Sequence, residues 1–266
     1  MNAALDAAFA RAHDEGRAAL IGYFPAGFPT VDDSIACIAA MVAGGVDIVE
    51  IGLPYSDPLM DGPIIQRAVE QALAQGTRTS DVLRVVAATA ATGAPTLVMS
   101  YWNPIEHHGV EAFATELAAA GGVGVITPDL TPEEARPWIR ATDAHGIARV
   151  FLVAPSSTTE RLGIVTQSTT GFVYAASLMG VTGARTSLST QAESLVTRTR
   201  AVTDRPVAVG LGVSTPEQVA DIARYADGVI VGSAFVRAVI DAPDMPAALV
   251  AVADLARNLA AGTRRA

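Results

Sequence analysis

The chain has 266 residues, of which 50% are hydrophobic and 17% are charged, so its composition is that of a globular protein with a substantial core. Its 18 basic residues are all arginine, and 27 acidic residues bring the formal net charge to −9, which disfavours nucleic acid and anionic membranes as partners. The absence of lysine excludes a Schiff-base lysine and a lysine-held pyridoxal phosphate. No apolar run reaches the roughly 20 residues of a membrane span, and residues 1–17 lack a basic region followed by an apolar one, so we expect a cytoplasmic protein.

Residues 1–17 are expected to form an N-terminal helix, after which short apolar runs alternate with longer segments that have apolar residues at helical spacing. The runs predict eight strands, at residues 19–24, 46–51, 95–101, 123–128, 148–154, 171–176, 205–212 and 227–232. Eight such units, with strands that are apolar throughout, predict a single-domain (β/α)8 TIM barrel over residues 1–266 with a frayed tail at 262–266. A doubly wound sheet is the main alternative, but no GxGxxG follows the first predicted strand.

Two helix starts carry the same signal, a threonine followed by a proline. Thr131–Pro132 and Thr215–Pro216 each offer a hydroxyl at the N-cap and a proline at the first helical position. We therefore expect a helix to begin at each of them.

An acid is the next-to-last residue of the second predicted strand, and another lies in the loop that follows it, within VEIGLPYSDPLMDGPIIQ (residues 49–66). In a barrel of this kind the catalytic groups stand at the C-terminal ends of the strands, where Glu50 and Asp61 would meet. Two carboxyl groups in different environments can acquire different pKa values and divide acid and base roles. Structural roles are the alternative: Asp61 could cap the helix that starts near Pro63, and Glu50 could belong to an ion pair between strands.

Glycine-containing segments follow the last three predicted strands, at residues 179–186, 209–215 and 231–235. In barrels, the loops after strands seven and eight and a short extra helix often form a phosphate site, made by backbone N–H groups that need no lysine. The segments could also be simple tight turns. No metal site is expected, because the adjacent His107 and His108 cannot share a helix or strand face and no third ligand is spaced beside them.

With these features together, the sequence resembles the tryptophan synthase alpha subunit family over nearly its whole length. The resemblance is carried by VEIGLPYSDPLMDGPIIQ, Tyr174, GVTG (180–183), GLG (210–212) and VGSA (231–234). It implies a lyase that cleaves indole-3-glycerol phosphate to indole and glyceraldehyde 3-phosphate by a retro-aldol route. Glu50 would shuttle protons at carbon and hydroxyl, and Asp61 would act on the indole N–H side.

The resemblance also implies substrate-binding residues and a partner. Substrate contacts are expected from Tyr23, Tyr174, Thr182, Gly183, Gly212, Gly232 and Ser233. Asp57, Pro58 and Asn103 are expected to contact a beta subunit in an alpha2beta2 heterotetramer. Pyridoxal phosphate is expected on that partner, and no cofactor on this chain.

Two other functions remain open at this point. A phosphoribosyl-isomerase type of barrel enzyme would share the glycine loops but would not need the DPLMDGP segment. A non-catalytic barrel could bind and activate a beta-type partner, although keeping both acids favours an enzyme.

Overall fold

The computed structural model describes residues 2–176, 185–210 and 212–265. The strands are β1 (Ala19–Pro25), β2 (Ile48–Gly52), β3 (Thr96–Met99), β4 (Gly124–Ile126), β5 (Ala148–Val150), β6 (Leu152–Val153), β7 (Val173–Ala176), β8 (Val207–Gly210) and β9 (Gly228–Val231). The helices are α1 (Ala3–Asp14), α2 (Val31–Ala43), α3 (Pro63–Ala74), α4 (Thr79–Ala90), α5 (Trp102–His108), α6 (Val110–Ala119), α7 (Arg136–His145), α8 (Thr159–Ser168), α9 (Arg185–Arg200), α10 (Pro216–Ala223), α11 (Ser233–Ile240) and α12 (Met245–Gly262).

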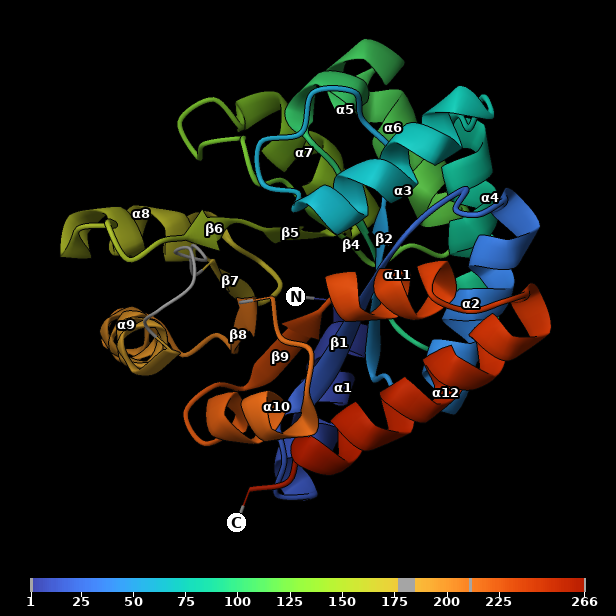
Figure 1. Ribbon diagram of the computed structural model, residues 1–266. Coiled ribbons are helices and arrows are strands. Elements are labelled where there is room, and N and C mark those ends of the chain that lie inside the picture. The colour runs from blue at the N-terminus through green and yellow to red at the C-terminus, as the bar shows by residue number, and fades with distance from the viewer. Residues whose placement is uncertain (1, 177–184, 211, 266) are drawn as a thin grey trace.

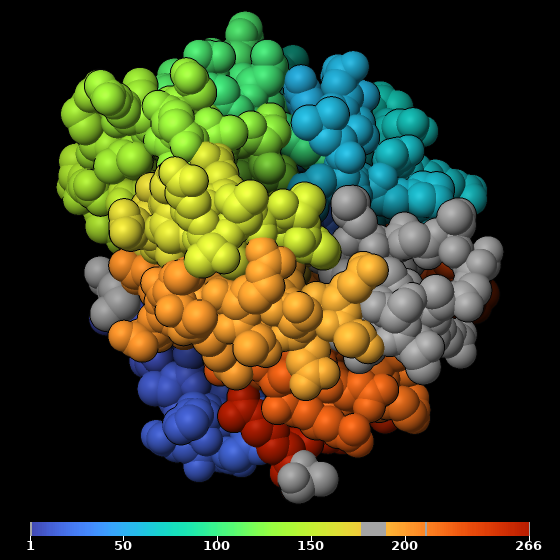
Figure 2. Space-filling model, turned by 90° about the vertical axis from the view of Figure 1, so that its left-hand side faces the viewer, coloured from blue at the N-terminus to red at the C-terminus, as the bar shows by residue number. Residues whose placement is uncertain are grey.

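Within the described residues the strands form one parallel sheet in the order β5-β4-β3-β2-β1-β9-β8-β7-β6. Its two edges, β5 and β6, are consecutive pieces of one segment, so the sheet closes on itself. Helices surround the strands (Figure 1), and α8 and α9 lie side by side on the outer surface (Figure 2). The predicted TIM barrel is confirmed.

The predicted strand at 148–154 is interrupted, so that eight predicted strands appear as nine. Its first half pairs with β4 through Val150, and its second half pairs with β7 from Leu152 onward. Phe151 lies between the two halves, and its carbonyl accepts a hydrogen bond from the backbone N–H of Tyr174 at 3.3 Å. Closing a barrel requires its strands to be staggered. Because of this stagger, the segment 148–154 changes its partner strand from β4 to β7 at its middle.

The strands bury both faces, because alternate side chains contribute to two different apolar clusters. Ile48 belongs to the cluster inside the barrel, whereas Val49 and Ile51 belong to the larger cluster between barrel and helices. Helix α1 closes the N-terminal end of the barrel, where Phe9 packs on Phe172 with ring centroids 5.6 Å apart. Side chains that lie inward near the other end of the strands are therefore the ones that can form a site.

The expected frayed tail is wrong for the residues up to Arg265. The Arg265 backbone N–H donates to the Gly16 carbonyl at 3.0 Å, and its side chain donates to the carbonyls of Ala223 and Ala226 at 2.9 and 3.0 Å. Arg264 forms a β-bridge with Arg17. The tail is ordered because it pairs with the segment that follows α1.

The two predicted helix starts have different outcomes. Thr215 caps α10 as predicted, accepting a hydrogen bond from the Gln218 N–H at 3.3 Å within a capping box. The start predicted at Thr131–Pro132 is wrong, because residues 132–134 form a turn and α7 begins only at Arg136. A helix running through this segment would meet Pro137, which has no N–H to bond to the fourth residue before it.

Candidate active site

Glu50 lies on the inside of the barrel. It is two residues beyond Ile48 in β2, so its side chain lies on the inward face, and its register partner on β1 is the inward-facing Tyr23. The Glu50 residue is only 3% exposed, and among the described residues its Oε2 atom has no hydrogen-bond partner. An ion pair between strands is thereby ruled out for that oxygen within the described part of the chain.

This environment raises the pKa of Glu50. Burial is the main cause and the negative charge of Asp61 adds to it, so that the pKa rises to about 8. A carboxylic acid in this setting stays protonated near neutral pH and can donate its proton.

Asp61 lies on the loop between β2 and α3. It does not cap α3, because Gly62 is the N-cap residue and no side chain bonds to that helix end. The Gln66 side-chain amide donates to the Asp61 backbone carbonyl at 2.7 Å. Burial raises the pKa of the Asp61 carboxyl to about 6, while a hydrogen bond from Tyr101 acts in the opposite direction. Asp61 is therefore mostly ionised near neutral pH, and the two acids differ in protonation state.

Tyr23 and Tyr174 share the space around the two acids. Burial raises the pKa of both phenols, and the charges of Glu50 and Asp61 raise them further. The four side chains are therefore close enough to affect one another electrostatically, so the structure brings these predicted residues together.

The sequence reasoning missed the glycines that make room for the two tyrosines. A Cβ atom added to Gly52 would lie 2.3 Å from the Tyr23 hydroxyl, and one added to Gly210 would lie 2.4 Å from the Tyr174 hydroxyl. Both glycines end strands, and each lies beside a predicted tyrosine. Their place at strand ends is the signal that could have identified them.

The glycine segments after β8 and β9 lie at the same end of the barrel as Glu50. Gly212 has φ of 65°, a left-handed conformation that favours glycine. Gly232 precedes α11, and a Cβ on it would lie 3.0 Å from Tyr23 Cδ1, so the start of this helix reaches the wall of the acid site. Ser233 is the first residue of α11, where backbone N–H groups lack partners within the helix. Thr182 and Gly183 lie outside the described residues.

The predicted partner-contact residues lie beyond the ends of β2 and β3, with Asp57 and Pro58 on the loop after β2 and Asn103 in helix α5. Asp57 and Asn103 are exposed and Pro58 is half-buried. Beside them Leu59 and Met60 are 76% and 44% exposed. The loop follows β2 and α5 follows β3, so both lie at the end of the barrel that holds the acids.

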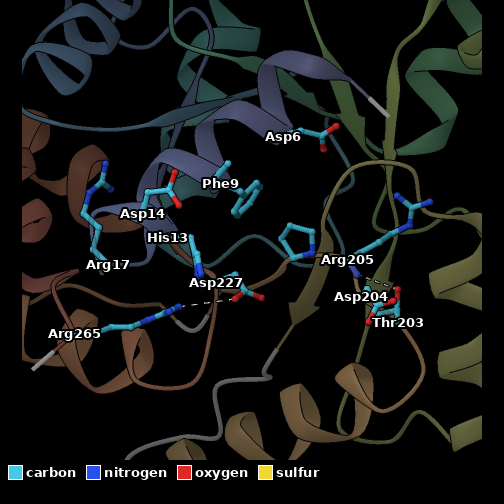
Figure 3. A pocket seen from close by; sticks show the side chains of 12 residues that line it. Asp6, Phe9, His13, Asp14, Arg17, Thr203, Asp204, Arg205, Asp227 and Arg265 are labelled. Atoms are coloured by element: carbon cyan, nitrogen blue, oxygen red, sulfur yellow. Dashed lines mark hydrogen bonds and ion pairs between the residues drawn. The ribbon is translucent and has the colours of Figure 1, made fainter.

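A cavity of about 710 Å³ lies at the other end of the barrel, between α1 and the residues that precede β1, β8 and β9 (Figure 3). Arginines line it, but they already have partners. Arg265 pairs with Asp227 at 3.8 Å, as the figure shows, and Arg205 donates to the Thr170 carbonyl at 3.3 Å. With its cations engaged and the two acids at the opposite end, this cavity is not the candidate active site.

The described residues contain no group of three or more histidine, cysteine, aspartate or glutamate side chains that could hold a metal ion. None of the described helices is long and apolar enough to cross a membrane.

Comparison with known proteins identifies the family. The family model for the tryptophan synthase alpha chain matches residues 9–264. The tryptophan synthase alpha chain of Thermobifida fusca is 62% identical over 260 residues, covering 97% of this chain and 96% of that protein. That of Streptomyces coelicolor is 58% identical, covering 98% and 96%.

Solved structures agree with the sequence relatives. A chain of Mycobacterium tuberculosis tryptophan synthase superposes with a TM-score of 0.90 at 52% identity, covering 98% of both chains. The tryptophan synthase subunit alpha of Legionella pneumophila gives 0.89 at 32% identity, covering 99% of this chain and 98% of that one. In this chain the mouth of the barrel carries the two acids, Glu50 and Asp61. Matches that extend over nearly the full length show that the chain belongs to the tryptophan synthase alpha chain family.

Proposed function

We propose that the chain is a carbon–carbon lyase that cleaves indole-3-glycerol phosphate into indole and glyceraldehyde 3-phosphate, as the alpha subunit of tryptophan synthase. The observation that carries the proposal is the pair of acids inside the barrel mouth, with pKa values raised to about 8 for Glu50 and about 6 for Asp61. Family membership supports the same reaction.

The proposed reaction needs one proton to reach carbon C3 of the indole ring and one proton to leave the side-chain hydroxyl. Glu50 can carry out both proton transfers. Protonated near neutral pH, it donates to C3, and the resulting carboxylate takes the hydroxyl proton as the carbon–carbon bond breaks. The electron pair of that bond returns to the ring and the hydroxyl becomes the carbonyl, so Glu50 ends protonated.

Asp61 has the complementary role. Protonation at C3 leaves a positive charge on the ring nitrogen, and the ionised Asp61 carboxylate stabilises it. The ring itself accepts the electrons, so the step needs neither a lysine imine nor a metal, in keeping with a chain that contains no lysine.

Substrate binding divides between the two sides of the mouth. Tyr23 and Tyr174 form a buried wall for the indole ring, next to the acids. Gly212, Gly232 and Ser233 donate backbone or hydroxyl hydrogen bonds to the phosphate, aided by the N-terminus of α11. Thr182 and Gly183, which lie outside the described residues, are proposed as further substrate contacts.

We further propose that the chain works in an alpha2beta2 heterotetramer. The beta subunit carries the pyridoxal phosphate and receives the indole, and this chain holds no cofactor. The loop that bears Asp57 and Pro58, together with Asn103 in α5, is the proposed contact surface.

The test is indole release from indole-3-glycerol phosphate by the purified chain, with and without a beta subunit, combined with measurement of the complex mass. We expect indole release and a two-to-two complex. A chain that binds the beta subunit but never releases indole would be a non-catalytic activator. Turnover of a phosphoribosyl substrate in place of indole release would support an isomerase instead.

A further inference from the structure

Tyr101 follows β3 and reaches across the barrel mouth to the loop that carries Asp61. The residue is 1% exposed and belongs to the cluster inside the barrel. Its ring packs on Tyr55, on the same loop, with centroids 5.4 Å apart. The buried Tyr101 ring thus contacts the loop at Tyr55, well before Asp61 in the sequence.

The Tyr101 hydroxyl bonds to the two loop residues directly before Asp61, which are Leu59 and Met60. It accepts hydrogen bonds from the backbone N–H groups of Leu59 at 3.1 Å and Met60 at 2.9 Å. Two acceptor bonds leave the hydroxyl proton free to be donated, and a hydrogen bond from Tyr101 to the Asp61 carboxyl lowers the pKa of that acid. Donors on the phenol oxygen polarise it and strengthen the bond that it donates.

The other contact to Asp61 fixes only its backbone. The Gln66 amide holds the Asp61 carbonyl from α3, and so it does not aim the carboxylate. Among the described residues Tyr101 therefore fixes the chain that leads to Asp61, through the N–H groups of Leu59 and Met60, and thereby sets where the carboxylate lies.

We propose that Tyr101 is a positioning residue that holds the Asp61 carboxylate against the nitrogen of the reacting ring. This inference rests on the proposed lyase function. Tyr101 itself transfers no proton. A shift of about 1 Å in a positioned group can slow a reaction about 100-fold, so this contact bears on the rate more than on substrate binding.

Tyr101→Phe tests the proposal, with Tyr55→Phe as the matched control. Both variants remove one phenol oxygen from the same stacked pair, but the Tyr55 hydroxyl has no hydrogen bond to the described residues. Leu59 and Met60 are exposed, so water can replace the lost acceptor and the Tyr101→Phe protein should still fold.

For Tyr101→Phe we expect kcat for indole release to fall about 10- to 100-fold with KM within about twofold of the wild-type value. We also expect the Asp61 carboxyl to titrate at higher pH in carbon-13 spectra of the ligand-free protein, with its signal assigned by its loss in Asp61→Asn. Tyr55→Phe should change neither. Wild-type kcat and an unmoved Asp61 titration in Tyr101→Phe would overturn the proposal, even if that variant melted at lower temperature.

The titration separates this proposal from the proposed function. If the wild-type protein releases no indole, the lyase assignment fails, while a shifted Asp61 titration in Tyr101→Phe still supports the positioning role. If the wild-type protein is active and the two tyrosine variants have equal kcat values and equal Asp61 titrations, only the positioning role fails.

Discussion

The Tyr23 ring fills the space beside Gly52, so that a Cβ atom on Gly52 would lie 2.3 Å from the Tyr23 hydroxyl oxygen. Tyr23 is 6% exposed, and a Cβ atom on Gly232 would lie 3.0 Å from Tyr23 Cδ1, so the ring is packed closely against both glycines. The two glycines therefore fix the wall of the acid site.

Gly52→Ala is expected to force Tyr23 out of place. Overpacking of this kind costs about 1–3 kcal/mol of stability, and we expect kcat to fall about 10-fold or more as the wall shifts. Gly163→Ala is the matched control, because nothing lies within 4 Å of a Cβ at that helical position. The control should gain up to about 1 kcal/mol in denaturant unfolding and keep its activity, whereas equal behaviour of the two variants would contradict this packing argument.

The pH dependence of kcat/KM should be bell-shaped. Asp61, with its pKa raised to about 6, must be ionised, so activity falls as the pH drops below that value. Glu50, with its pKa raised to about 8, must be protonated, so activity falls above it. The two pKa values read from the profile describe the interacting pair of acids and not either residue alone. Asp61→Asn should leave low residual activity whose profile has lost the acid limb, and a profile of unchanged shape in that variant would refute the assignment.

Glu50 should also make stability depend on pH. Because burial raises its folded pKa above the ordinary value of 4.5, the stability associated with this group is fully present below pH 4.5 and is lost as the pH rises to about 8. Each unit of raised pKa corresponds to about 1.4 kcal/mol.

Glu50→Gln removes this dependence. The melting temperature of the variant relative to wild type should therefore increase steadily between pH 4.5 and pH 8, as followed by thermal unfolding in matched buffers. Ser233→Ala serves as the control, and its melting temperature should differ from that of the wild type by the same amount at every pH. A Glu50→Gln difference that does not vary with pH would mean that Glu50 titrates normally.

The barrel was predictable because its signal is repeated: each apolar run alternates with a helical segment, and errors in one unit do not alter the count of the others. The exception is the segment 148–154, whose interruption at Phe151 depends on the stagger of the closed barrel. Nothing local in the sequence reports that stagger.

The two helix starts show how local signals compete. Thr215 is followed by Gln218, which completes the capping box. The helix start predicted at Thr131 does not form, because Pro137 follows six residues later. This proline lies outside the four residues of the capping motif. The motif is reliable only where the following turn can remain helical.

The candidate site was partly predictable. The positions of Glu50 and Asp61 follow from strand order alone, but their protonation states depend on how deeply each carboxyl is buried. Tyr101 was missed because its contacts with Leu59 and Met60 join segments about forty residues apart through backbone N–H groups, which leave no mark in the sequence.

The most direct test of the account is single-turnover indole release by Glu50→Gln, measured together with its affinity for indole-3-glycerol phosphate. The amide keeps the size of the side chain but cannot donate and recover a proton. We predict a rate at least about 100-fold below wild type with affinity within about twofold, as expected when a general acid-base is removed and the phosphate contacts remain. A single-turnover rate close to that of the wild-type chain would contradict the central role of Glu50.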